Sequence, residues 1–216
     1  MFKIKNIVTI SDYITIINII LGMFAILFHD FRFIYGAIVF DALDGYIARK
    51  TNTVSDFGAQ LDSLCDVVSF GVAPAYLLYF YFENISTLIA SLIFLVCGAL
   101  RLARFGVLNV KYFVGLPIPA GALVLSVFCQ LFLRYSKDLG SIVSMDINNL
   151  AISLLAVLVG LIMISDIKYP KYPNKIALML FGISLLLSLV GIFEVLFICV
   201  IGYLLYGILK MDMEGS

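Results

Sequence analysis

Apolar stretches of about 20 residues follow one another along almost the whole chain, and they limit what it can fold into. Of its 216 residues, 63% are hydrophobic and 13% are charged, against roughly 25% charged residues in a soluble domain. This composition predicts an all-α, polytopic transmembrane helical bundle, because a helix satisfies its backbone hydrogen bonds within lipid. We expect one domain, 1–216, with a six-helix core, C-terminal helices and about eight spans, near residues 7–28, 32–49, 62–82, 86–108, 117–135, 149–165, 175–190 and 193–210.

Lysine and arginine are distributed unequally between the two sides of the predicted membrane. If the N-terminus is cytoplasmic, eleven of them share its side: Lys3, Lys5, Arg49, Lys50, Arg101, Arg104, Lys111, Lys168, Lys171, Lys175 and Lys210. Three lie on the other side: Arg32, Arg134 and Lys137. The positive-inside rule therefore predicts an even number of spans, with both termini on the cytoplasmic side of the cell membrane.

Four aspartates interrupt the apolar sequence: Asp41, Asp44, Asp62 and Asp66. A carboxylate at membrane depth costs about 2.5–3.5 kcal/mol, so four of them need a compensating ligand. Spacings of three and four residues place each pair on one face of its helix, and the polar turn 49–57 brings the two helices together. Oxygen ligands of this kind favour hard cations, so we expect two divalent ions, Mg²⁺ or Mn²⁺. Such a site suits displacement at a phosphate on the cytoplasmic side.

Residues near the aspartates fit a phosphate ligand as well. Gly45 and Gly58 leave room for a ligand to approach the backbone, and Arg49 supplies a permanently charged, bidentate donor. Ser55 adds one hydroxyl donor. Taken singly, the aspartates also fit a proton relay or cation transporter, the glycines close helix packing, and Arg49 a cytoplasmic anchor.

The complete pattern from Asp41 to Asp66 resembles the signature of the CDP-alcohol phosphotransferase family: Asp-x-x-Asp-Gly-x-x-Ala-Arg, eight residues, then Gly-x-x-x-Asp-x-x-x-Asp. The resemblance implies that the four aspartates bind two divalent ions and that Asp66 is also the proton acceptor. It further implies that Gly45, Arg49 and Ser55 contact the CDP-alcohol. In this family the phosphoalcohol moiety moves from a CDP-activated lipid or alcohol to an acceptor hydroxyl.

Further segments resemble the phosphatidylserine synthase branch of this family. They are Arg-x-x-Arg-Phe at 101–105, Gly-Leu-Pro-x-Pro-Ala at 115–120, and Thr15, Asn18 and Gly22 in the first helix. The chain departs from the branch at Ser11-Asp12, where members often carry Pro-Asn.

Two pairs of residues from these segments have alternative roles. Thr15 and Asn18 lie on one helical face, which either lines the CDP-alcohol cleft or forms a packing seam. Arg101 and Arg104 also share a face, at the depth of the aspartates, and either hold the carboxylate of an acceptor or act as cytoplasmic anchors.

The resulting hypothesis is a membrane enzyme that transfers a phosphatidyl or archaeal-type phospholipid group to L-serine and releases CMP. The expected partners are a CDP-activated lipid, L-serine, membrane lipids and a second copy of the chain in a homodimer, with no nucleic acid. The alternatives are glycerol 3-phosphate or inositol phosphate as acceptor, or a cation- or proton-coupled transporter. A transporter would be expected to spread polar groups through the membrane depth, whereas here they gather towards one side.

Overall fold

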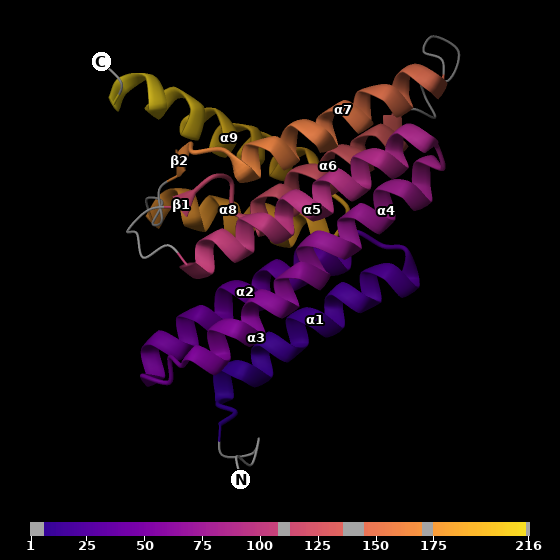
Figure 1. Ribbon diagram of the computed structural model, residues 1–216. Helices are drawn as coiled ribbons and strands as arrows, with labels where there is room; N and C mark the ends of the chain where they lie inside the picture. The colour runs from indigo at the N-terminus through magenta and orange to yellow at the C-terminus, as the bar shows by residue number, and fades with distance from the viewer. Residues whose placement is uncertain (1–6, 108–112, 136–144, 170–174, 215–216) are drawn as a thin grey trace.

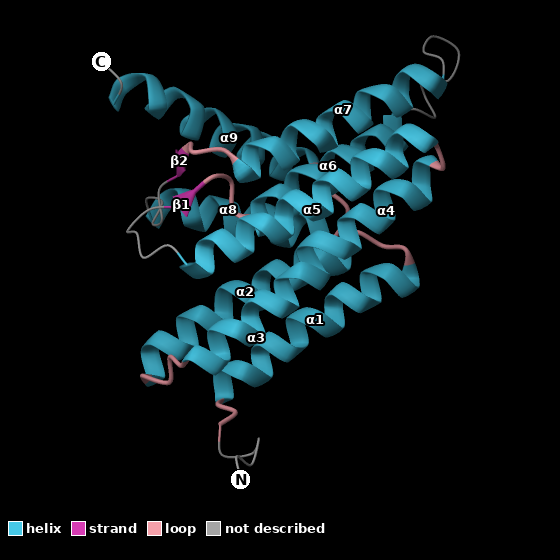
Figure 2. Ribbon diagram, in the orientation of Figure 1, coloured by secondary structure: helices cyan, strands magenta, loops and turns pink. Residues whose placement is uncertain are grey.

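The computed structural model describes residues 7–107, 113–135, 145–169 and 175–214, which are almost entirely helical (Figure 2). The elements follow in the order α1 (Ile10–Phe28), α2 (Arg32–Thr51), α3 (Asp56–Asp66), the π-helix η2 (Val67–Val72), α4 (Ala73–Phe82), α5 (Ile85–Val107), β1 (Phe113–Val114), α6 (Ile118–Tyr135), α7 (Met145–Ile164), β2 (Lys168–Tyr169), α8 (Lys175–Leu189) and α9 (Glu194–Glu214).

Across the described ranges there are eight helical segments, because α3, η2 and α4 form one continuous run. Five of them are long and apolar enough to cross a membrane: Ile10–Phe28, Asp56–Phe82, Ile85–Val107, Ile118–Tyr135 and Ile147–Ile164. α2 is as long, but it carries both aspartates of its pair and three basic residues. The prediction of an all-α polytopic membrane bundle is confirmed, with five candidate spans among the eight helical segments of the described residues, and the chain is an integral membrane protein.

Two local features differ from the sequence-based expectation. The third span begins at Asp56 and not at 62, because Ser55 caps the helix and accepts a hydrogen bond from the Gly58 amide at 3.0 Å. In addition, the two-residue strands β1 and β2 pair in antiparallel fashion (Figure 2). Beside β1, Gly115 has a φ of +75°, and a Cβ there would lie 2.1 Å from the Met163 carbonyl oxygen. This turn therefore requires glycine.

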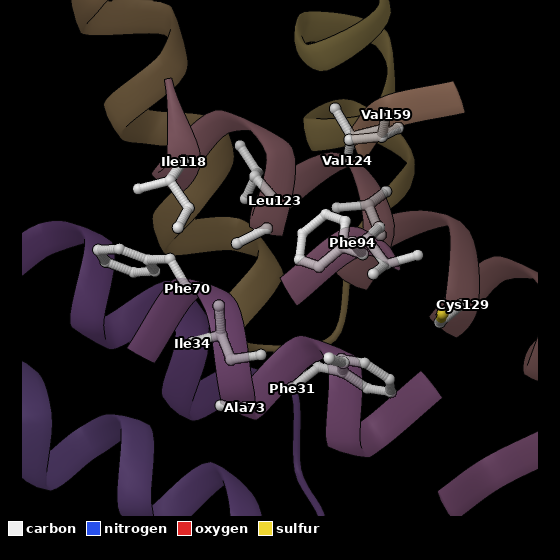
Figure 3. Packing of buried hydrophobic residues seen from close by; sticks show 14 of the residues in the cluster. Phe31, Ile34, Phe70, Ala73, Phe94, Ile118, Leu123, Val124, Cys129 and Val159 are labelled. Carbon is white, nitrogen blue, oxygen red and sulfur yellow. The ribbon is translucent and has the colours of Figure 1, made fainter. Parts of the chain in front are cut away.

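The helices pack as two groups joined by the third span. Figure 1 shows α1, α2 and α3 together on one side, with α5, α6 and α7 on the other. α1 packs along α2 and α5 along α7, while η2 contacts α1, α5 and α6. The core between the groups contains Phe70, Phe94, Ile118 and Leu123, all buried (Figure 3). Both aspartate pairs consequently belong to the first group, on α2 and α3.

Candidate metal centre

Three carboxylates converge between α2 and α3. Oxygen atoms of Asp41, Asp62 and Asp66 all lie within 4.8 Å of one another. Asp62 and Asp66 are one helical turn apart on α3, and the turn after α2, where Asn52 has a φ of +54°, directs α3 back along α2. The structure therefore brings together the two predicted pairs, although not all four side chains equally.

Asp44 lies beside this cluster and has a different partner. Its Oδ2 accepts a hydrogen bond of 2.6 Å from the Thr15 hydroxyl on α1, and the side chain is buried. Electrostatic interactions link it to Asp41 and Asp62. Asp44 is thus close enough to act with the cluster while Thr15 fixes its orientation.

The polar face of α1 contacts the carboxylates. Besides the bond from Thr15 to Asp44, the Asn18 amide nitrogen donates to Oδ1 of Asp66 at 3.3 Å. Asn18 is fully buried and Thr15 is 3% exposed. Both residues were expected to contact the CDP-alcohol or to form a packing seam, and in the structure their side chains orient two of the four aspartates.

These residues fit a divalent cation. In the described part of the chain, Oδ1 of Asp62 is buried without a hydrogen-bond partner. An orphaned, buried carboxylate oxygen is costly, and three carboxylates at this distance repel one another. A hard cation would relieve both effects, because carboxylate oxygens are its preferred ligands. The donor set therefore supports a divalent-metal centre.

Arg49 extends along the rim of the site over Gly45. A Cβ at position 45 would lie 3.3 Å from Nη1 of Arg49, so glycine lets the guanidinium lie close to α2. Arg49 is exposed and interacts electrostatically with Asp44. The positively charged guanidinium of Arg49 thus lies next to the aspartates, where a phosphate group would arrive from the aqueous side.

Asp12 is a further buried acid that the motif did not identify. It is 2% exposed, and its Oδ2 accepts hydrogen bonds from the Thr9 amide at 2.7 Å and the Thr9 hydroxyl at 3.0 Å. A Cβ on Gly58 would lie 2.8 Å from Oδ1 of Asp12, so this glycine makes room for α1 and not only for a ligand. The spacing from Thr9 to Asp12 is that of a helix cap, and this signal was present in the sequence.

The two arginines of α5 have different surroundings. Arg101 is 5% exposed, interacts electrostatically with Asp41 and Asp66, and lies over the Phe105 ring at 5.2 Å. Arg104 donates hydrogen bonds to four carbonyl oxygens at the ends of β1 and α7, those of Val114 (2.9 Å), Met163 (3.4 Å), Ile164 (3.0 Å) and Ser165 (2.8 Å). Arg101 therefore interacts with the aspartates, while Arg104 ties α5 to the end of α7.

Comparison with known proteins identifies the family. A family model described as CDP-alcohol phosphatidyltransferase matches residues 6–206. The chain is 60% identical over 211 residues to the CDP-diacylglycerol–serine O-phosphatidyltransferase of Methanocaldococcus jannaschii, which covers 97% of this chain and 98% of that protein. It is 38% identical over 183 residues to the archaetidylserine synthase of Methanothermobacter thermautotrophicus, covering 78% of this chain and 72% of that protein. The predicted family is thereby confirmed: this chain belongs to the CDP-alcohol phosphatidyltransferases.

Proposed function

We propose that this protein transfers the phospholipid group of a CDP-activated lipid to the hydroxyl of L-serine and releases CMP. The observation that carries the proposal is the cluster of Asp41, Asp62 and Asp66, with oxygens within 4.8 Å, next to the buried Arg101. The names of the relatives, which are serine phosphatidyltransferases or an archaetidylserine synthase, support the choice of serine. Membership of this family favours group transfer over the transporter alternative.

In this proposal the four aspartates hold two divalent cations, Mg²⁺ or Mn²⁺. Asp41, Asp62 and Asp66 supply the clustered oxygens. Asp44 supplies a further carboxylate oxygen, and the hydrogen bond from Thr15 fixes its orientation. When bound, the cations would neutralise the diphosphate and stabilise the charge of departing CMP.

The CDP part binds at the rim next to these aspartates. Gly45 leaves the backbone of α2 open, Arg49 donates to the phosphates, and Ser55 contacts the CDP-alcohol at the capped start of α3. Thr15 and Asn18 contribute by orienting Asp44 and Asp66.

Asp66 is the proton acceptor in the transfer step. It takes the proton of the serine hydroxyl, and the freed oxygen forms a bond to the β-phosphorus of the CDP-lipid. The bond from that phosphorus to the oxygen of the α-phosphate breaks, and CMP leaves with its electron pair. The product is a phosphodiester of serine, and the reaction needs no covalent intermediate with the protein.

Arg101 holds the carboxylate of serine. A charge-assisted hydrogen bond contributes about 1.5–3 kcal/mol, so Arg101→Ala should raise the KM for serine about 10- to 100-fold and the KM for CDP-lipid much less. Arg104→Ala is the matched control, because it removes the bonds to Val114, Ile164 and Ser165. That variant should lower the melting temperature and alter both KM values alike. An equal rise of both KM values in Arg101→Ala would contradict acceptor binding.

The active site and both termini lie on the cytoplasmic side of the cell membrane, and the protein forms a homodimer. The support for orientation is the excess of Lys and Arg on the side of the aspartates. Cysteine labelling from either side of sealed vesicles tests the orientation, and light scattering of the detergent-solubilised protein tests the dimer.

The proposed acceptor is tested by CMP release from purified protein supplied with CDP-diacylglycerol and Mn²⁺ or Mg²⁺. Parallel reactions contain L-serine, glycerol 3-phosphate, inositol phosphate or no acceptor. We expect rapid CMP release with serine alone. Faster CMP release with glycerol 3-phosphate or inositol phosphate would show that this compound, and not serine, is the acceptor. The assignment to group transfer from a CDP-lipid would remain.

A further inference from the structure

The helix that carries Asp66 changes its geometry immediately after this residue. Val67–Val72 form a turn of π-helix between α3 and α4, and three successive residues in it, Ser69, Phe70 and Gly71, are buried. π-helical turns are rare and are often found at functional sites. This one lies where α1 crosses the third span, and it also contacts α5 and α6.

Ser69 joins this turn to α1. Its hydroxyl donates a 2.9 Å hydrogen bond to the main-chain carbonyl oxygen of Asn18. Buried serines in helices commonly bond to a carbonyl of their own helix, as Ser153 does with Asn149. The hydroxyl of Ser69 instead donates its hydrogen bond to a different helix, and the side chain is fully buried.

The two backbones meet closely at this point. A Cβ on Gly22 would lie 2.4 Å from Oγ and 2.7 Å from Cα of Ser69, so α1 can approach the π-turn only with glycine at position 22. Gly22 is one helical turn after Asn18. The contact therefore fixes both the distance and the rotation of α1 where Asn18 projects from it.

Asn18 connects this contact to the carboxylate centre. Its main-chain oxygen accepts from Ser69, and its side-chain amide nitrogen donates to Oδ1 of Asp66 at 3.3 Å. All three side chains are at least nine-tenths buried, so water does not compete for these bonds. A displacement of α1 at Asn18 would move the donor that holds Asp66.

We propose that Ser69 is a positioning residue for Asp66 and acts through Asn18, with Gly22 providing the close approach of the helices. The inference rests on the proposed role of Asp66 in the metal centre and in proton transfer. Ser69 neither touches the substrate nor binds the cation. It sets the orientation of the Asp66 carboxylate by holding α1 against the π-turn.

The test is a double-mutant cycle on the full-length protein, with Mn²⁺ affinity measured by titration calorimetry and kcat measured by CMP release. Loss of a group that hydrogen-bonds to a metal ligand typically lowers metal affinity or activity about 10- to 100-fold. Asn18→Ala should therefore lower Mn²⁺ affinity and kcat by about 10- to 100-fold. Ser69→Ala, which is one contact further from the metal ligand, should lower them by about 3- to 10-fold. If Ser69 acts through Asn18, the double variant should resemble Asn18→Ala alone. Ser69→Cys keeps a hydrogen-bond donor at this position, although the thiol is larger and donates more weakly, and should fall between serine and alanine.

Ser126→Ala is the matched control. Ser126 is a fully buried serine on α6 whose hydroxyl has no hydrogen-bond partner in the described residues, so its removal should leave Mn²⁺ affinity and kcat unchanged. Additive losses in the double variant, or wild-type Mn²⁺ affinity and kcat in Ser69→Ala, would overturn the inference. Failure of the wild type to bind Mn²⁺ would overturn it together with the metal centre. If the losses of Mn²⁺ affinity in the two single variants are not additive but serine does not stimulate CMP release, the positioning role of Ser69 stands. Only the proposal that serine is the acceptor is then overturned.

Discussion

Replacing Asp66 by asparagine is expected to lower kcat by about 100- to 10,000-fold, the range typical for removal of a general base. Asparagine has nearly the same shape but cannot accept the hydroxyl proton. At Mn²⁺ concentrations that saturate the weakened metal centre, CDP-lipid binding should remain within a few-fold of wild type, because Arg49 and the other aspartates are unchanged. Single-turnover CMP release and equilibrium binding of a CDP-lipid measure the two effects separately.

Asp30→Asn provides the control for this substitution. Asp30 lies in the turn between α1 and α2, at the opposite end of α1 from Asp12, and forms an ion pair with Arg32 at 2.6 Å. The same chemical change at this position should leave kcat at the wild-type value. Turnover near wild type in Asp66→Asn would exclude Asp66 as the proton acceptor.

Removal of divalent cations is expected to abolish CMP release, and added Mg²⁺ or Mn²⁺ should restore it. Two unit charges at 4.8 Å repel by on the order of 3 kcal/mol at an effective dielectric constant of 20. Three clustered carboxylates would therefore exclude the anionic diphosphate unless a cation lies between them. Full activity of extensively chelated protein would contradict a metal centre at Asp41, Asp62 and Asp66.

A second variant separates the cluster from a general requirement for cations. Asp62→Asn removes one charge from a residue whose Oδ1 has no hydrogen-bond partner in the described structure. It should raise the Mn²⁺ concentration needed for half-maximal activity, whereas Asp30→Asn should not. An unchanged Mn²⁺ requirement in Asp62→Asn would place the cation elsewhere.

The sequence predicted the membrane bundle and the pairing of the two helices that carry the aspartates, because both depend on local spacing. Hydropathy over about 20 residues identifies a spanning helix, and intervals of three or four residues place carboxylates on one helical face. The polar turn between Arg49 and Asp56 made an antiparallel arrangement of α2 and α3 the natural expectation. The convergence of Asp41 with Asp62 and Asp66 agrees with that expectation.

The features that the sequence did not predict depend on contacts between distant segments. Arg101 and Arg104 lie on one helical face, so the sequence gives no reason to assign them different roles. In the structure Arg104 bonds to carbonyl oxygens at the end of α7, about 60 residues later in the chain, and this contact gives it a structural role. The two-residue strands β1 and β2 likewise pair across the length of α6 and α7. The π-turn and the bond from Ser69 to Asn18 arise from the packing of α1 on the third span, which no local pattern encodes.

The most direct test of the account follows labelled serine and CMP in the same reaction. Purified protein in CDP-lipid micelles with Mn²⁺ should incorporate L-serine into an extractable phospholipid and release one CMP for each serine incorporated. Both products should disappear with chelator and in Asp66→Asn. CMP release without serine incorporation, or serine incorporation that persists in Asp66→Asn, would contradict transfer to serine at this carboxylate centre.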